Sequence, residues 1–269
     1  MRSAHCLIVT LAWLLLTLAC ATATAATADR CLAVSDAGPR IHRASLRPVV
    51  LKPTEVRLTF VGHATFLIES AGGVKIATDY NDYLRPRVVP DIITMNHAHE
   101  THFTPFPDPR IRHVLRGWNP AGGPAMHDLT VGDVRVRNVT TNLRGWTGGT
   151  EMYGNSIFVF EIAGLCIAHL GHLHHTLTPR HLGQIGQLDV VLAPVDGSYT
   201  LDMDGMLEVL KALRARLVIP MHYFGETTLT RFLQRMQPTF KVKRSSTPTV
   251  VISHQSLPAQ PEILVLPGN

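Results

Sequence analysis

Three histidines stand within six positions, directly after an apolar run that predicts a buried strand. In "DIITMNHAHETHF", His97, His99 and His102 follow the run "DIITM". A short, continuous apolar run is typical of a strand that is buried on both faces. A polar loop that happens to be rich in histidine is the plain alternative. The order of strand and histidines favours a metal site at the end of the strand, because imidazole nitrogen suits zinc, iron, nickel and copper.

Three other apolar runs end in the same way. "LCIA" leads to His169 and His172, "VVLAPV" leads to Asp196, and "LVIPM" leads to His222. Because ligands of open α/β sheets bind outside the carboxyl ends of the strands, we expect these side chains to converge there. The sequence leaves open whether His169 or His172 is the ligand, with His172 preferred. The predicted metal ligands are His97, His99, His102, His172 and His222.

Two further residues are predicted to take part in catalysis. Three protein ligands and an open position are the pattern of catalytic zinc, which turns bound water into hydroxide near neutral pH. Asp196 is expected to act as a ligand or as the base that positions water. His63, in the turn Gly62-His63-Ala64, is expected to donate a proton at the mouth of the cleft. A turn residue bonded to the backbone is the alternative for His63.

The remaining pattern predicts many strands first and then alternating helices and strands. Helices are expected over 178–186, where Thr178 can cap the helix and Pro179 suits its first position, over 202–215 and over 227–237. A hairpin is expected about Gly132-Asp133, and two strand-like runs follow Pro238. We therefore predict an α/β (α+β) domain over residues 55–269, with sheets inside and helices outside, after an extended lead-in over residues 29–54.

The first 28 residues are typical of a secretory signal peptide. An apolar stretch over 7–19 is followed by small residues in A-x-A patterns that end at Ala28. A retained anchor is the alternative, although the stretch is short for a span of ~20 residues. Lipidation at Cys20 is a second alternative. We expect an exported protein, periplasmic or secreted, with no stable membrane span after cleavage.

The cysteines and arginines give weaker indications. The chain has four cysteines, of which Cys31 and Cys166 would remain after cleavage. In an exported protein these two can form a disulfide, and two unrelated small apolar residues are the alternative. Four arginines on predicted loops would suit an anionic group on a small-molecule substrate, and solvent-facing arginines are the alternative; they are Arg85, Arg87, Arg110 and Arg144. The formal net charge is only +5 and no basic run interleaves with aromatic residues, so nucleic acid is not an expected partner.

Six motifs occur in a familiar order between Glu55 and Tyr223. They are "VGHATFLIES", "IATDY", "HAHETH", "IAHLGHLHH", "LAPVDGSYTLD" and "VIPMHY". Together they resemble the metallo-β-lactamase (MBL) superfamily, and within it a branch similar to ascorbate-6-phosphate lactonase-like and N-acyl-phosphatidylethanolamine phospholipase D-like hydrolases. The resemblance implies a four-layer αββα sandwich, a buried Asp79 that supports the metal loop, and His222 as the last histidine ligand.

Three positions depart from the pattern of that superfamily. Thr101 stands where an Asp binds the second metal, His172 stands where an Asp bridges two metals, and Asn142 stands near the place of a further His. We therefore expect one zinc ion rather than two, with iron or manganese as alternatives. The expected function is an exported metal-dependent hydrolase that uses a metal-bound hydroxide on an ester, lactone, amide or phosphodiester. The alternative is a non-hydrolytic metal-binding member of the same fold with a degenerate ligand set. The sequence does not indicate an oligomeric state.

Overall fold

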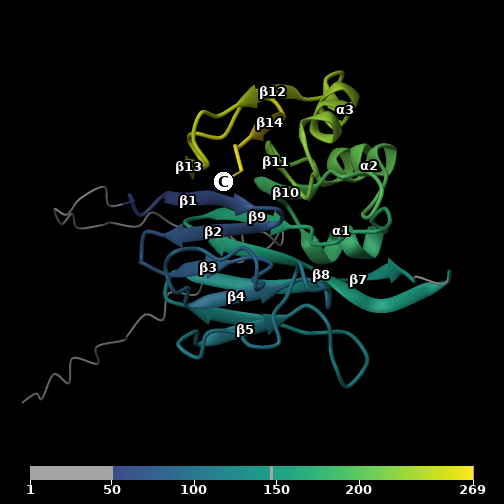
Figure 1. Ribbon diagram of the computed structural model, residues 1–269. Coiled ribbons are helices and arrows are strands. Elements are labelled where there is room, and N and C mark those ends of the chain that lie inside the picture. Colours follow the sequence, from purple (N-terminus) through teal and green to yellow (C-terminus); the bar gives the residue numbers. More distant parts are fainter. Residues whose placement is uncertain (1–50, 146–147, 269) are drawn as a thin grey trace, which may run out of the picture.

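Two β-sheets pack face to face in the computed structural model, which describes residues 51–145 and 148–268 (Figure 1). The six-stranded sheet contains β1 (Glu55–Gly62), β2 (Thr65–Ser70), β3 (Lys75–Ala77), β4 (Ile92–Met95), β5 (His113–Arg116) and β13 (Thr249–Ser253), in the order β13-β1-β2-β3-β4-β5. The eight-stranded sheet contains β6 (Asp128–Val131), β7 (Val134–Arg144), β8 (Thr150–Ile162), β9 (Leu165–His169), β10 (Val190–Pro194), β11 (Leu217–Met221), β12 (Lys241–Arg244) and β14 (Glu262–Val265), in the order β12-β14-β11-β10-β9-β8-β7-β6.

Alternating side chains of the strands build apolar layers on both faces of the sheets. Along β10, Val190 and Leu192 point into the space between the sheets, whereas Val191 and Ala193 point to the outer face. On that outer face they pack against the apolar sides of α1 (Pro179–Ile185), α2 (Met203–Leu213) and α3 (Glu226–Met236). Outside the six-stranded sheet, a smaller cluster buries Ile93 beneath loop residues such as Phe103. The predicted sheets inside are observed, and among the described residues the three helices lie outside the eight-stranded sheet, whereas loops cover the six-stranded one.

The predicted elements match the structure closely, with one correction. The three predicted helices are confirmed, and the Thr178 hydroxyl accepts the His181 N–H at 3.2 Å, as a cap of α1 should. The hairpin at Gly132-Asp133 joins β6 to β7. The expectation of two strands after Pro238 was wrong, because β12, β13 and β14 all form. The sequence of β12, "KVKR", is a mostly exposed edge strand without an apolar run, and it therefore carries little hydrophobic signal.

Parallel pairing sets the place of the site. Strands β9, β10 and β11 are parallel neighbours in one sheet, and β3, β4 and β5 are parallel neighbours in the other. Their carboxyl ends carry the polar residues that the sequence singled out, with His97 two residues after β4 and His222 directly after β11.

The N-terminal predictions lie mostly outside the described residues. The proposed signal peptide over 1–28, Cys20, Cys31 and most of the lead-in over 29–54 precede the first described residue, Leu51. The domain boundary at residue 55 stays a prediction, and β1 starts at that residue. Within 51–145 and 148–268, no helix has the length and apolar character needed to cross a membrane.

Candidate metal centre

The structure brings the five predicted histidine ligands into one cluster, and His63 joins them. The ring of His102 lies 5.1 Å from that of His222, 4.8 Å from that of His172 and 6.1 Å from those of His97 and His99, measured between ring centroids. The ring of His63 lies 4.2 Å from that of His222. Imidazoles from distant parts of the chain therefore share one small volume, as a metal site requires.

His102 is held by a buried carboxylate. Its Nδ1 lies 2.7 Å from Asp79 Oδ2, and both side chains are completely buried. The other oxygen of Asp79 accepts the Asn96 N–H at 2.9 Å. Burial raises the pKa of Asp79 to about 6, so the carboxylate is ionised at neutral pH and accepts the Nδ1 proton of His102. This arrangement leaves the Nε2 lone pair of His102 free for a ligand, as in carboxylate–histidine–metal sites.

His222 is oriented in the same way by Asp196. Its Nδ1 donates to Asp196 Oδ1 at 2.9 Å, and the Thr200 hydroxyl donates to the same oxygen at 2.5 Å. The backbone N–H groups of Ser198, Tyr199 and Thr200 donate to Oδ2 at 2.8, 2.6 and 3.1 Å. Burial alone would raise the pKa of Asp196, but hydrogen bonds from His222 and Thr200 hold it below its usual range. Both oxygens are engaged, so the geometry gives Asp196 the task of orienting His222.

The two held imidazoles face each other. His102 Nε2 lies 3.3 Å from His222 Nε2. Each ring already carries its proton on Nδ1, where it faces a carboxylate. A hydrogen bond between the two Nε2 atoms would therefore need an additional proton on one ring, which is unfavourable because burial holds the pKa of His102 well below its usual value. Two nitrogens bound to one tetrahedral zinc ion at 2.0–2.1 Å would be about 3.3–3.4 Å apart. The separation of the two lone pairs thus fits a shared cation.

His63 completes a group of three. One ligand atom each from His63, His102 and His222 lies within 4.8 Å of the others. The Nε2 atom of His63 is buried and has no hydrogen-bond partner in the described part of the chain, which is costly for a polar atom unless a ligand satisfies it. Burial lowers the pKa of His63 to about 4, so the ring is neutral at neutral pH. The main chain of His63 also takes part, since its carbonyl accepts the His222 N–H at 2.7 Å.

Three residues of the centre have strained backbone conformations. His63, Asp79 and His222 have φ angles of 51°, 42° and 56°, in the left-handed region that residues with a Cβ rarely adopt. Such strain costs on the order of 1 kcal/mol per residue and clusters at functional sites. Two of the three supply imidazoles to the group that could hold a metal, and the third is the carboxylate behind His102.

His97 and His99 line another side of the cluster. The Nδ1 atom of His97 donates to the Gly154 carbonyl at 3.1 Å, which leaves its Nε2 lone pair free. His99 is exposed, and its Nδ1 lies 3.0 Å from the Thr101 hydroxyl. The Asn142 side chain accepts the Tyr153 N–H at 3.0 Å. Thr101 and Asn142, at two of the three atypical positions, are thus tied to neighbouring protein groups.

The contacts of His169 and His172, between which the sequence left the choice of ligand open, differ. His169 is completely buried, its Nε2 donates to the Ala64 carbonyl at 2.8 Å, and its Nδ1 accepts the Gly171 N–H at 3.1 Å. Both ring nitrogens of His169 are therefore used within the protein. His172 is the one whose ring lies in the cluster, 5.0 Å from that of His222.

The predicted anion-binding arginines are mostly engaged with the protein itself. Arg85 bonds to the Asn81 carbonyl and Asp82, and Arg110 bonds to Asp108. Arg144 donates to the carbonyls of residues 198–200. The structure instead places two exposed aromatic rings beside the centre, which the sequence did not single out.

These rings belong to Tyr199 and Phe224. They are 63% and 61% exposed, their centroids are 5.5 Å apart, and the Phe224 ring lies 5.5 Å from the ring of His222. Single aromatic residues in loops have no periodic signal that a sequence could reveal. They give the centre an apolar rim.

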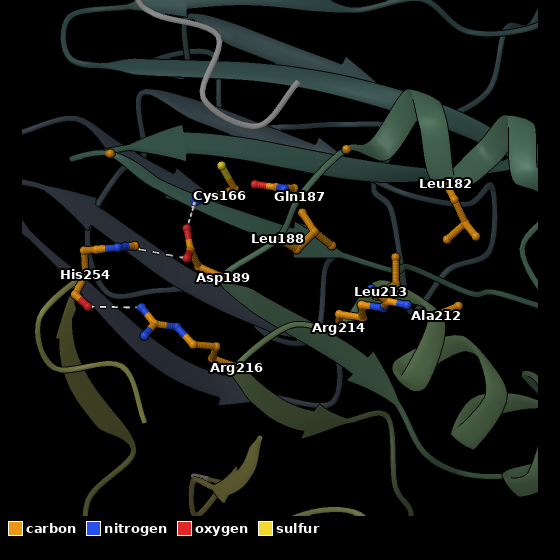
Figure 2. A pocket seen from close by; sticks show the side chains of 12 residues that line it. Cys166, Leu182, Gln187, Leu188, Asp189, Ala212, Leu213, Arg214, Arg216 and His254 are labelled. Atoms are coloured by element: carbon orange, nitrogen blue, oxygen red, sulfur yellow. Dashed lines mark hydrogen bonds and ion pairs between the residues drawn. The ribbon is translucent and has the colours of Figure 1, made fainter. Parts of the chain in front are cut away.

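A separate hollow of about 680 Å³ lies at the opposite ends of the same strands (Figure 2). Cys166, Asp189 and Arg216 line it, and each stands at or next to the amino end of β9, β10 or β11. The Cys166 N–H donates to Asp189 Oδ2 at 2.9 Å. Cys166 is disulfide-bonded, and its partner lies outside the described residues, where all other cysteines of the chain are found. The metal-binding chemistry is at the other edge, so this hollow is not the metal centre.

Comparison with known proteins finds relatives of this chain in sequence and in fold. The chain is similar to UPF0173 metal-dependent hydrolases from Ignicoccus hospitalis, with 25% identity over 63% of this chain and 83% of the relative, and from Pelotomaculum thermopropionicum, with 28% identity over 62% and 84%. A solved structure from Thermotoga maritima, described as a candidate Zn-dependent hydrolase of the metallo-beta-lactamase superfamily, is 28% identical with a TM-score of 0.58 and covers 80% of this chain and 100% of that chain.

The fold of a second structure agrees. The metallo-beta-lactamase fold protein YhfI from Bacillus subtilis is 10% identical with a TM-score of 0.51, and covers 80% of this chain and 98% of that chain. The predicted MBL fold is confirmed, with two mixed sheets and few helices. The family model described as "Beta-lactamase superfamily domain" matches residues 57–222, which is more than half of the chain. The chain therefore belongs to the metallo-β-lactamase superfamily.

Proposed function

We propose that this protein is a hydrolase that depends on a single zinc ion held by His63, His102 and His222. The observation that carries the proposal is the 3.3 Å separation of the two Nε2 atoms of His102 and His222, each on a ring whose Nδ1 is bonded to a carboxylate. The buried, unpartnered Nε2 of His63 supports it as the third nitrogen. This set differs from the one expected from the sequence, in which His63 was a proton donor. Iron or manganese are the alternative metals.

A second ion is not part of the proposal. His97 and His99 would have to provide it, but the hydroxyl of Thr101 is bonded to His99 and the side chain of Asn142 to Tyr153. Within residues 51–145 and 148–268 no carboxylate bridges the two halves of the cluster, and His172 stands at the position of the bridging Asp. We assign His97 and His99 to the side of the site where a substrate would lie.

A bound zinc ion would activate water and polarise the scissile oxygen of the substrate. The protein supplies the orientation. Asp79 fixes the ring of His102, and Asp196 fixes the ring of His222, so both keep the tautomer that binds a metal. The burial of these groups strengthens every electrostatic interaction in the site, since water is excluded from them.

For the substrate, we propose an ester, lactone, amide or phosphodiester with an apolar group beside the scissile bond. The lactone and the phosphodiester come from the resemblance to the lactonase-like and phospholipase-like branch. The apolar group is suggested by the exposed pair Tyr199 and Phe224 at the rim. An anionic group is less well supported, because Arg85, Arg110 and Arg144 already have partners within the protein.

The decisive experiment combines metal analysis with hydrolysis. The purified protein should contain about one zinc per chain and should hydrolyse p-nitrophenyl acetate or bis(p-nitrophenyl) phosphate. The variant His102→Ala should lose both the metal and the activity. His254→Ala is the matched control, because the side chain of His254 is 65% exposed and remote from the cluster, at the hollow of Figure 2.

Two results would change the proposal. A full complement of metal without turnover of either substrate would support the alternative, a non-hydrolytic metal-binding protein, which the substitutions at Thr101, Asn142 and His172 favour. Purified wild-type protein that neither contains nor takes up zinc, iron or manganese would contradict both functions.

We also propose that the protein is exported. The signal-like stretch over residues 1–28 is the main support, and the disulfide at Cys166 adds to it, since disulfides persist in oxidising compartments. N-terminal sequencing of the mature protein should find a start near residue 27 or 29. An intact Met1 in the mature protein would contradict export by cleavage.

A further inference from the structure

A backbone amide fixes the tautomer of His174. The Arg144 N–H lies 2.8 Å from His174 Nδ1. A backbone amide can only donate, so Nδ1 of His174 must accept and cannot carry a proton. The proton of the neutral His174 ring is therefore on Nε2.

The fixed proton of His174 determines the tautomer of His172 in turn. His174 Nε2 lies 2.7 Å from His172 Nδ1. Since His174 Nε2 is the donor, His172 Nδ1 is the acceptor, and the proton of His172 is on Nε2. This is the opposite tautomer from His97, His102 and His222, whose Nδ1 atoms donate to a carbonyl or a carboxylate.

The ring of His172 lies beside the proposed metal ligands, so the position of its proton affects what it can bind. Its ring lies 4.8 Å from that of His102 and 5.0 Å from that of His222, in T-shaped contact with both. An Nε2 that carries a proton has no lone pair for a metal but can donate a hydrogen bond. Among the described residues, Nε2 of His172 has no hydrogen-bond partner of its own.

We propose that His172 is a hydrogen-bond donor to the substrate, not a metal ligand. Resting on the proposed hydrolysis, the inference assigns to the Nε2–H of His172 the carbonyl or phosphoryl oxygen that gains negative charge in the reaction. A carboxylate at this position would repel that oxygen, whereas a neutral imidazole donor attracts it. The substitution of the bridging Asp by His172 thus exchanges a ligand of a second metal for an oxyanion contact.

His174 and Arg144 are the positioning residues of His172. The Nη2 atom of Arg144 donates to the carbonyls of Ser198, Tyr199 and Thr200 at 3.0, 3.2 and 2.8 Å. This contact ties the end of β7 to the loop whose amides hold Asp196. The loop over residues 198–200 therefore holds both His174, through Arg144, and His222, through Asp196.

Nitrogen NMR of the wild-type protein tests the tautomers directly. In ¹⁵N-histidine-labelled, zinc-loaded protein, long-range ¹H–¹⁵N spectra should show His172 and His174 with protonated Nε2 and unprotonated Nδ1. His102 and His222 should show protonated Nδ1 and a metal-bound Nε2. A metal-bound Nε2 at His172, or a protonated Nδ1, would overturn the inference.

Variants give a second, independent measurement. His172→Ala should retain about one zinc per chain while kcat for p-nitrophenyl acetate or bis(p-nitrophenyl) phosphate falls by roughly 10²–10³-fold, as when one oxyanion donor is removed. His172→Gln, which keeps an N–H donor, should recover part of that loss. His174→Ala should keep the zinc and lower kcat more than it changes KM. Loss of zinc in His172→Ala, with His172→Gln folded and also free of zinc, would show that His172 is a ligand and would overturn the inference.

The two proposals can fail separately. A zinc-loaded wild-type protein without turnover would contradict hydrolysis and with it the substrate contact of His172. An active enzyme with metal-bound His172 would support hydrolysis and contradict this inference alone.

Discussion

The Nδ1 atom of His222 lies 2.9 Å from Oδ1 of Asp196, a carboxylate whose other oxygen binds three successive backbone amides. One side chain thus orders the loop over residues 198–200 and orients an imidazole of the candidate metal centre. A general base needs an oxygen that is free to take a proton from water. Asp196 has no such oxygen here, and its role is better tested as that of a positioning residue.

Replacing Asp196 by asparagine should weaken both the loop and the metal site. The amide nitrogen of Asp196→Asn would face either the backbone amides or the Nδ1–H of His222, so donors would meet donors. We expect the free energy of unfolding of the metal-free protein to fall by about 1–3 kcal/mol, and zinc affinity to fall by about 10–100-fold. Denaturant unfolding and chelator competition measure the two effects.

The control for that experiment is Asp128→Asn, which removes an exposed carboxylate paired with Arg135. It should change the stability by less than about 1 kcal/mol, because exposed ion pairs contribute little. Unchanged zinc affinity and stability in Asp196→Asn would contradict the positioning role.

Gly171 is the glycine on which the placement of His172 depends. Its φ is +61°, and a Cβ there would meet Asn155 and come within 2.6 Å of Asn96 Nδ2. Gly171→Ala should therefore destabilise the protein by more than about 1 kcal/mol. Gly183→Ala, in helix α1, is the matched control: nothing lies within 4 Å of the added methyl group, and a change between zero and about 1 kcal/mol of stabilisation is expected. Thermal unfolding compares the two, and equal melting temperatures would refute the packing argument.

Much of this site could be predicted from the sequence because its signals are local. Apolar runs followed at once by histidine predict strand ends, and parallel strands bring such ends together. The five clustered histidines singled out in this way are His97, His99, His102, His172 and His222. The helices were equally visible, because Thr178 and the apolar spacing of residues such as Met206 and Leu210 act within a single turn or two.

The hydrogen-bond network could not be predicted, because it joins residues that are far apart in the chain. Nothing in "HLGHLHH" shows that Arg144 donates to His174, or that the proton of His172 consequently resides on Nε2. The sequence likewise could not show that both nitrogens of His169 are used within the protein. Residue type and order indicate which groups can bind a metal, whereas tautomer and orientation depend on three-dimensional contacts.

The stability of the metal-free protein should fall as the pH is lowered from 6.5 to 4. Burial lowers the pKa of His63 and His174 to about 4 and also lowers those of His97, His102, His169 and His172. Between pH 6.5 and 4 the unfolded chain binds protons at these histidines, whereas the folded protein does not. Lowering the pH therefore favours unfolding. Each completely buried histidine contributes about 1 kcal/mol per pH unit.

Asp79 acts in the opposite direction. Its pKa is raised by burial to about 6, so between the usual pKa of 3.8 and about 6 the folded protein binds a proton that the unfolded chain does not. One carboxyl group opposes several histidines, and the net effect remains a loss of stability on acidification. Melting temperatures of the chelator-treated protein between pH 4.5 and 7.5 check this, and a flat or rising stability towards acid would contradict the neutral histidine cluster.

The disulfide at Cys166 should link the start of the mature chain to the amino end of β9. Cys166 lies at the hollow of Figure 2, and its partner is outside the described residues. If residues 1–28 are removed on export, Cys31 is the only other cysteine left. Peptide mass mapping without reductant should then find the peptide of Cys166 joined to that of Cys31, and Cys166→Ser should lower the free energy of unfolding by about 2–5 kcal/mol. The matched control is reduction of the wild type, which should give the same loss, since it breaks the same bond without a substitution. A bond between Cys166 and Cys20 would mean that the leader is retained, and a free Cys166 thiol in protein isolated from the oxidising compartment would contradict the tether.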